Sequence, residues 1–247
     1  METQLNIKET QYKKVSKLLS KGDTNAKTAK NFLETNILYL SPFTKNDRKI
    51  NVCRNASPGC IFVCLDTAGM GVFSNVQAAR INKTNFYLYD KDNFSAQLVK
   101  ELRNINKRAV KLGKKVAIRL NGTSDLDFMA ILKNRTGVDI LEEFPNLEYY
   151  DYTKSLNKAK KYAGVSRYTL TFSRSEINEA ECIEALKLGY NVSVVFDHKK
   201  PMPTEYLGTP VIDGDEADDL MLTNKGVIIG LKAKGKARFD TSGFVVK

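Results

Sequence analysis

The stretch Val116-Ala-Ile-Arg-Leu-Asn-Gly-Thr-Ser-Asp125 decides the fold class of this chain, because it joins an apolar run directly to a polar group. Residues Val116–Leu120 are short, apolar and partly β-branched, which predicts a buried β-strand. Polar residues follow at once, and the next segment, Asp125–Lys133, predicts a helix. A strand that ends in polar residues and leads into a helix is the repeating unit of an α/β protein.

The same unit recurs on both sides of this stretch. Short apolar, β-branched or aromatic runs predict strands at Asn36–Leu40, Val116–Leu120, Glu148–Tyr152, Tyr168–Phe172, Asn191–Phe196, Pro210–Ile212 and Val227–Leu231. Helices are predicted at Gln11–Ser20, Val76–Thr84, Asn93–Leu112, Asp125–Lys133, Ser155–Ala163 and Ser175–Leu188. We expect Ser173 or Ser175 to cap the last of these helices and Gly189 to end it.

Strand–helix alternation within 247 residues favours one parallel sheet in a single domain. We therefore predict an α/β fold, a single-domain partial or complete parallel (β/α) barrel of the TIM type over residues 31–247. A basic, helical N-terminal extension over residues 1–30 is expected to precede it. Most of the predicted strands run directly into polar residues. Because parallel barrels build their sites at the carboxyl ends of the strands, these residues are expected to share one site.

The composition bounds the function classes. No apolar run is long enough for a membrane helix, and the segment Met1-Glu-Thr-Gln-Leu-Asn6 has no apolar core of a signal peptide. We therefore expect a cytoplasmic protein whose thiols stay reduced.

The charge is strongly basic, with 39 basic and 28 acidic residues and a formal net charge of +11. Many of the lysines lie in two stretches, Lys8–Lys30 and Lys100–Lys115. Such a field attracts nucleic acid or nucleotides. The alternative is a lysine-rich solvated surface, and the second stretch also has the spacing of an amphipathic helix.

Three cysteines, Cys53, Cys60 and Cys64, lie within twelve residues at the spacing C-x6-C-x3-C. Soft thiolates select zinc or iron–sulfur clusters. An iron–sulfur cluster on three thiolates would keep one iron open to a ligand. A structural zinc ion would need a fourth ligand, for which His198 is the only histidine. Redox cysteines are the remaining alternative, and the distant Cys182 is expected to be a small buried hydrophobe.

Three further groups carry alternatives that the sequence leaves open. The group Arg119–Asp125 could contact phosphate or ribose, or Ser124 or Asp125 could cap the next helix. The acidic group Asp213–Asp219 could hold magnesium or calcium, or it could be a solvated loop paired with lysines. Those lysines, in the run Lys232-Ala-Lys-Gly-Lys-Ala-Arg238, are the best candidate for anion binding, and a solvated charge run is the alternative.

The layout of a three-cysteine loop after the first strand resembles the radical S-adenosylmethionine (SAM) enzymes. That resemblance implies a partial barrel, a [4Fe–4S] cluster on Cys53, Cys60 and Cys64, and SAM bound at the open iron. The segment Gly226-Val-Ile-Ile-Gly230 looks like the family's late-strand motif near the adenine, and Asn121-Gly-Thr123 stands where the family contacts the SAM amino group. The cysteine spacing departs from the family's C-x3-C-x2-C.

Closer similarity links the chain to a phage- and prophage-encoded protein family with a three-cysteine loop. The matching segments span about residues 20 to 247 and are Asn51-Val-Cys…Cys60…Cys64-Leu, Ala79-Arg-Ile-Asn-Lys-Thr84, Arg119–Asp125, Tyr150-Asp-Tyr-Thr-Lys154, Thr171-Phe-Ser-Arg-Ser-Glu176, Val211-Ile-Asp-Gly-Asp-Glu216 and Gly230-Leu-Lys-Ala-Lys-Gly-Lys-Ala237. This resemblance implies a phage origin and no particular activity.

Two functional hypotheses follow. The first is an iron–sulfur enzyme of radical-SAM-like type that acts on a nucleotide or nucleic acid, and the second is a zinc-stabilised nucleic-acid-binding protein without catalysis. Under the first, the expected catalytic residues are Asn121, Ser173, Arg174 and Asp213. The expected cofactor-binding residues are Thr123, Gly226, Gly230, Lys232, Lys234 and Lys236, and the expected metal ligands are Cys53, Cys60 and Cys64.

Overall fold

The computed structural model describes residues 12–22, 30–217 and 219–247. Its strands are β1 (Leu19–Lys21), β2 (Glu34–Leu38), β3 (Val116–Arg119), β4 (Leu147–Thr153), β5 (Tyr168–Ser173), β6 (Asn191–Phe196), β7 (Glu205–Tyr206), β8 (Thr209–Asp213) and β9 (Ile228–Lys232). Its α-helices are α1 (Pro58–Phe62), α2 (Ser74–Tyr89), α3 (Lys91–Lys111), α4 (Phe128–Thr136), α5 (Ile140–Glu143), α6 (Leu156–Lys161), α7 (Glu179–Lys187) and α8 (Leu220–Thr223). Short 3-10 helices are η3 (Leu65–Thr67), η4 (Gly69–Val72) and η5 (Gly235–Phe239).

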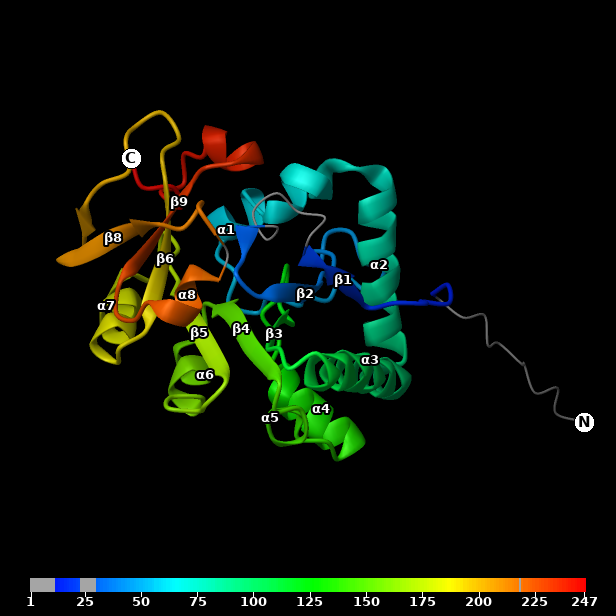
Figure 1. Cartoon of the computed structure of the whole chain (residues 1–247). Helices are drawn as coiled ribbons and strands as arrows, with labels where there is room; N and C mark the ends of the chain where they lie inside the picture. The colour runs from blue at the N-terminus through cyan, green and yellow to red at the C-terminus, as the bar shows by residue number, and fades with distance from the viewer. Residues whose placement is uncertain (1–11, 23–29, 218) are drawn as a thin grey trace, which may run out of the picture.

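The strands form one sheet of nine in the order β1-β2-β3-β4-β5-β6-β9-β8-β7 (Figure 1). All neighbours from β2 to β8 in this order are parallel, whereas the two edge strands, β1 and β7, pair antiparallel with β2 and β8. The predicted α/β class and its largely parallel sheet are confirmed. A complete barrel is not formed, because the sheet ends at β1 on one side and at β7 on the other.

Apolar packing concentrates on the outer face of the sheet, along which α3, α4, α6 and α7 lie (Figure 1). Alternate residues of β3, β4 and β5, such as Ile118, Tyr149 and Leu170, pack with α2, α3 and α4 in the largest core cluster. A second cluster joins Val192 and Val194 of β6 to Cys182 and other residues of α7. Burial of this face is the main driving force that holds the helices on the sheet.

The predicted helix Gln11–Ser20 is wrong over the residues that the structure describes. Residues 12–18 are irregular, and Leu19–Lys21 form β1, which pairs with β2. The side chains of Leu18 and Leu19 are buried, and their backbone N–H groups donate to the carboxylate of Glu101 on α3, at 2.8 and 2.9 Å. Tertiary contacts to α3 and β2 therefore set this local conformation. The proposed boundary near residue 30 stays a prediction.

Helix starts differ from the prediction at two places, each with a local cause. Helix α4 begins at Phe128 after Asp127, whose carboxylate accepts from the N–H of Ala130, so neither Ser124 nor Asp125 is its cap. Helix α7 begins at Glu179 after Asn178, and neither Ser173 nor Ser175 caps it.

Two further features match the sequence. Gly189 follows α7 with a positive φ, as expected for a residue that ends a helix. None of the helices in the described ranges combines the length and apolar character needed to cross a bilayer.

Candidate functional site at the carboxyl edge of the sheet

The carboxyl ends of the parallel strands lie at one edge of the sheet, as expected from their shared direction. Backbone hydrogen bonds connect the segments after these ends: Gly122 N–H donates to the carbonyl of Leu38, and Asp125 N–H donates to the carbonyl of Val52. The loop after β3 is therefore attached both to β2 and to the start of the cysteine loop. These contacts bring the loops together at one edge, and a shared site there stays a prediction.

The cysteine loop folds around the one-turn helix α1. Ser57 caps this helix, because its side chain accepts from the backbone N–H of Cys60 at 3.2 Å, and Pro58 occupies the first turn. Cys60 therefore lies on α1, Cys64 follows its end, and Cys53 lies on the preceding loop. All three thiols are free and half-buried.

Glu176, which follows β5, holds the cysteine loop on the sheet. Its carboxylate accepts from the hydroxyl of Ser57 at 2.7 Å and from the N–H of Gly59 at 2.8 Å. A Cβ at position 59 would lie 2.4 Å from Oγ of Ser242 and 2.7 Å from Oε2 of Glu176, so this close approach requires glycine. Cys60 packs against the cluster of Val63, Ala233, Ala237, Phe244 and Val245.

The three thiols lie within electrostatic reach of one another. The pKa of Cys53 is raised to about 12, mainly by burial and also by the neighbouring Cys64, Asp125 and Cys60, whereas Lys154 lowers it. Burial also raises the pKa of Cys64, to which Cys60 contributes. Cys53 Sγ lies 3.6 Å from the carbonyl oxygen of Thr123. The loop therefore gathers three soft donors at the strand ends.

The donor set fits a soft metal by its chemistry, since it consists of thiols. Among residues 12–22, 30–217 and 219–247, no three His, Cys, Asp or Glu side chains are arranged so that they could hold one metal ion. His198, the proposed fourth zinc ligand, lies beside Asp197, with its Nδ1 3.3 Å from Oδ1 of that residue. A single-ion site is therefore not preformed in the described part of the chain.

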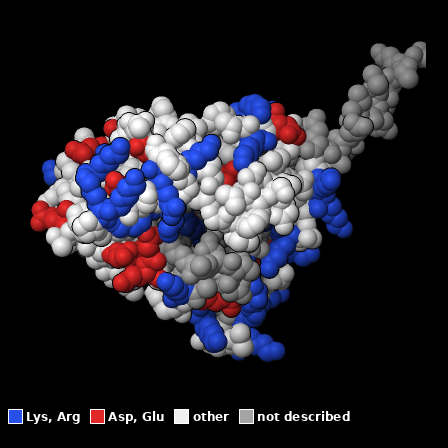
Figure 2. All heavy atoms as spheres, turned by 90° about the horizontal axis from the view of Figure 1, so that it is seen from above, with Lys and Arg blue, Asp and Glu red and all other residues white. Residues whose placement is uncertain are grey.

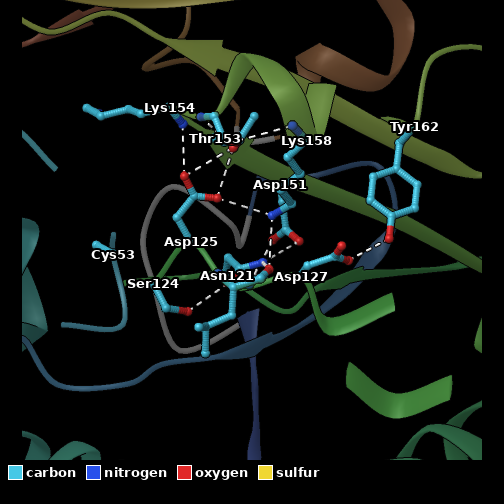
Figure 3. Close-up of polar contacts among 12 residues, drawn as sticks. Cys53, Asn121, Ser124, Asp125, Asp127, Asp151, Thr153, Lys154, Lys158 and Tyr162 are labelled. Carbon is cyan, nitrogen blue, oxygen red and sulfur yellow. Dashed lines mark hydrogen bonds and ion pairs between the residues drawn. The ribbon is translucent and has the colours of Figure 1, made fainter. Parts of the chain in front are cut away.

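A buried polar network joins the ends of β3 and β4 (Figure 3). Asp151 accepts from the backbone N–H of Asn121 at 2.7 Å and from its Nδ2 at 2.9 Å, while Oδ1 of Asn121 accepts from Ser124 and from Leu126 N–H. Burial raises the pKa of Asp151. Asn121, a predicted catalytic residue, is thus buried and bonded on both sides of its amide, which assigns it a role in holding this loop.

Asp125 is the second centre of this network (Figure 3). Its carboxylate accepts from Thr153 Oγ1 at 2.9 Å and from the N–H of Lys154 at 2.9 Å, and it forms an ion pair with Lys158 Nζ at 3.1 Å. The side chains of Lys158 and Asp125 are only 7% and 9% exposed. This ion pair ties the loop after β3 to α6.

Lys154 points its ammonium group toward β5. Its Nζ donates to Oγ of Ser173 at 2.7 Å and lies 5.5 Å from the ring centre of Phe244. Sequence reasoning placed Ser173 in the site and named Asp125 as a possible ligand contact or helix cap, but it missed Lys154 and Lys158. The only signal was the polar Thr153-Lys154 pair at the end of a predicted strand, because the partners of Lys154 are distant in the sequence.

The other two predicted catalytic residues, Arg174 and Asp213, lie in different parts of the fold. Arg174 Nη1 donates to the carbonyls of Gly243 at 2.6 Å and Phe244 at 2.9 Å, so it attaches the C-terminal segment to β5. Asp213 lies at the end of β8, where its Oδ1 accepts from the N–H of Asp215 at 2.8 Å. Arg174 is therefore next to the cysteine loop's packing partners, whereas Asp213 stabilises its own turn.

The predicted cofactor-binding glycines and Thr123 have structural roles. Gly226 precedes β9 and so lies at its amino end, opposite to the carboxyl edge. Gly230 lies within β9, where an added Cβ would be 2.5 Å from Met202 Sδ, so glycine is needed there for packing. Thr123 Oγ1 donates to the carbonyl of Leu40 at 2.6 Å.

The predicted anion-binding lysines after β9 meet the acidic segment instead. Asp215 accepts from the N–H of Lys232 at 2.9 Å and forms an ion pair with Lys234 Nζ at 2.7 Å. Lys236 Nζ lies 5.8 Å from the ring centre of Phe62 on α1. Pairing between the acidic loop and these lysines, one of the two interpretations of the sequence, is thus present at Asp215. Asp218 lies outside the described residues.

Comparison with known proteins gives one family. The family model described as gene product 88 (GP88) matches residues 16–247. No curated protein and no solved structure matches the chain. The match covers both the cysteine loop and all the strand ends described above, and it agrees with the phage family that the sequence resembles. The chain therefore belongs to the gene product 88 family of phage proteins.

Proposed function

We propose that this phage protein is an iron–sulfur protein whose loop of Cys53, Cys60 and Cys64 holds a [4Fe–4S] cluster at the carboxyl edge of the sheet. The observation that supports the proposal is the set of three thiols on one loop at the strand ends that interact electrostatically with one another. In a cubane cluster each thiolate binds a different iron, so its ligands stand further apart than those of a single zinc ion. A cluster therefore accommodates thiols that are too far apart to share one zinc ion.

Three protein ligands would leave one iron of the cluster open to an exogenous ligand. The proposal extends to a radical-SAM-like enzyme that binds SAM there and acts on a nucleotide or nucleic acid in the host cytoplasm. The support is the sequential order of β2 to β6, which is the order of a partial (β/α) barrel, together with the cysteine loop at the carboxyl edge. Formation of 5′-deoxyadenosine from SAM by the dithionite-reduced protein is the test of this extension.

The test of the cluster is metal analysis and visible absorption of the full chain purified without oxygen. We expect about four irons and four sulfides per chain with a broad visible band. Cys60→Ala should lose the iron. Cys182→Ala is the matched control, because Cys182 lies on α7, buried against β5 and β6 and distant from the loop in the sequence, and this variant should keep the iron. Colourless protein with one zinc per chain would reject the cluster.

A second candidate is a zinc-stabilised nucleic-acid-binding protein without catalysis. Lys and Arg gather on the face seen from above in Figure 2, next to a group of Asp and Glu. On η5 and next to it, Lys234, Lys236 and Arg238 are exposed, and Lys236 lies over the ring of Phe62, which is 54% exposed. Exposed aromatic rings among basic side chains are typical of single-strand binding.

This second candidate predicts affinity for single-stranded DNA or RNA that falls steeply as salt rises. Lys236→Ala should lower the slope of log affinity against log salt by about 1. Binding that does not change with salt, or no binding at low salt, would reject this candidate.

A further inference from the structure

The inner face of the sheet differs in chemistry from the helix-covered outer face. Because side chains alternate along each strand and register partners share a face, the strand pairings identify the inner residues. These inner-face residues are Thr35, Ile37, Ala117, Arg119, Glu148, Tyr150, Tyr152, Thr169, Thr171, Ser173, Asn191, Ser193, Val195, Ile229 and Leu231, with Glu148 at the amino end of β4. Parallel sheets are commonly apolar on both faces. Here the inner face is rich in hydroxyl groups.

The hydroxyl groups of β5 and β6 concentrate toward the carboxyl edge. Ser173 and Ser193 are direct register partners, and Thr171 precedes Ser173 by one strand repeat. Thr171 is 0% exposed, and its Oγ1 has no hydrogen-bond partner among the described residues. A buried hydroxyl without a partner is unfavourable and uncommon in folded proteins, so this atom needs a separate explanation.

Lys154 brings a positive charge to these hydroxyls. Its Nζ bonds to Ser173 Oγ at 2.7 Å and has no carboxylate within ion-pair distance among the described residues. The three lysines of the adjacent α6 differ from it, because Lys158, Lys160 and Lys161 all form ion pairs, with Asp125, Glu184 and Asp127 respectively. Within the described part of the chain, Lys154 thus brings an ammonium group without a carboxylate partner to the point where β4 and β5 end.

The same corner is next to the cysteine loop and to a second cationic side chain. Asp125, which accepts from the backbone of Lys154, is bonded through its own N–H to Val52, the residue before Cys53. The guanidinium of Arg119, another inner-face residue, lies 4.6 Å from the ring centre of Tyr152. A ligand placed against the hydroxyls of β5 and β6 would therefore lie beside the ammonium group of Lys154, at the edge of the sheet that carries the cysteine loop.

We propose that Lys154, Thr171, Ser173 and Ser193 form a binding site for the oxyanion group, phosphate or carboxylate, of a small organic molecule. The ammonium group supplies charge, and the hydroxyls of Thr171 and Ser173 supply hydrogen-bond donors, with Thr171 Oγ1 gaining the partner that it lacks. Ser193 Oγ donates to the carbonyl of Phe172 at 3.4 Å, a long hydrogen bond that it would exchange for one to the ligand. An ammonium group and several hydroxyl donors are the elements that bind phosphate and carboxylate in proteins. As the substrate site of an iron–sulfur enzyme this inference rests on the proposed function, but the binding itself does not require a cluster.

The test is calorimetric titration of the full chain with inorganic phosphate, AMP and succinate as separate probes. The informative variant is Lys154→Met, and Lys160→Met is its matched control, since it makes the same change on the surface of α6. We expect at least one probe to bind, with an affinity about tenfold lower in Lys154→Met and within twofold of the wild type in Lys160→Met. The phosphate and succinate arms distinguish the two oxyanions.

The proposal is overturned if no probe binds the wild type at millimolar concentration, or if Lys154→Met binds as the wild type does. If Lys154→Met does not fold, Ser173→Ala takes its place, and unchanged affinity in that variant also overturns the proposal. Iron content is measured on the same samples. If the protein contains iron but binds no oxyanion, this inference fails while the cluster stands. If it binds an oxyanion but contains no iron, the cluster fails while this inference stands.

Discussion

The ion pair between Lys158 and Asp125 should be the most sensitive polar contact of the strand-end network. Lys158 Nζ lies 3.1 Å from Asp125 Oδ1 and 3.0 Å from the carbonyl oxygen of Leu126, and both charged side chains are more than nine-tenths buried. Lys158→Met removes the cation but leaves a buried carboxylate. Removal of one partner of such a pair lowers the free energy of unfolding by about 3–5 kcal/mol.

Lys160→Met is the control for this prediction, because it changes the same residue type two positions away on α6. Its ion pair with Glu184 is solvent-exposed, at 48% and 47% for the two side chains, and exposed pairs contribute about 0–1 kcal/mol. The double variant Asp125→Asn/Lys158→Met removes both charges. Its loss should be smaller than the sum of the two single losses, because no charge remains buried without a partner.

Urea denaturation at neutral pH measures five proteins: the wild type, the single variants Lys158→Met, Asp125→Asn and Lys160→Met, and the double variant. The slope of unfolding free energy against urea checks that the unfolded states are comparable. A loss for Lys158→Met within about 1 kcal/mol of that for Lys160→Met would refute the burial argument. Additive losses in the double variant would refute the pairing. Either result would mean that water or other groups compensate Asp125.

Three further predictions concern the attachment of the cysteine loop by Glu176. Glu176→Gln should speed the reaction of the loop thiols with a disulfide reagent, because it weakens two charge-assisted hydrogen bonds that hold the loop. The control Glu181→Gln, on the exposed side of α7, should leave this reaction rate unchanged. Burial raises the pKa of Glu176, but the hydrogen bonds from Ser57 and Gly59 outweigh it and lower the pKa below the ordinary 4.5. The wild type should therefore be more stable than Glu176→Gln by the full amount at neutral pH. This stability difference should disappear as the pH falls from 4.5, the ordinary pKa, through the lower pKa that Glu176 has in the folded protein. Urea titrations in which the difference grows on acidification would contradict this sign. Gly59→Ala should lower the free energy of unfolding by about 1–3 kcal/mol, because its Cβ would collide with Ser242, and an unchanged urea midpoint would show that the loop moves freely.

The sheet could be predicted well from the sequence because its strands are short apolar runs with sharp polar ends. All seven predicted strands are present, from β2 to β9, and only the edge strands β1 and β7 were missed. The segment before β2 could not be predicted, because its lysine-rich pattern suggests a surface helix. Its strand form depends on pairing with β2 and on Glu101 of α3. Neither contact is visible in a local window.

The sequence predicted the region of the candidate site, but it predicted the roles of the individual residues less well. Cys53, Cys60 and Cys64 were recognised by spacing, and the structure brings them to the strand ends with Ser173 and Arg174 nearby. Helix α4 was expected to start at Asp125. The structure instead uses that carboxylate to bind Lys158, Thr153 and the backbone of Lys154, so the helix starts three residues later. Partners that are about thirty residues apart decide between a cap and an ion pair.

The polar inner face carried a signal that the prediction did not use. In β5 the residues Tyr168, Leu170 and Phe172 face the helices, while Thr169, Thr171 and Ser173 face inward, a strict alternation along the strand. A parallel strand covered by apolar groups on both faces would be a continuous apolar run. Alternation in a parallel strand therefore indicates that its two faces have different surroundings, and in β5 the inward face carries the hydroxyl groups. In this chain that face ends at Lys154 beside the cysteine loop, which is why the oxyanion site and the thiols are expected to act on the same ligand.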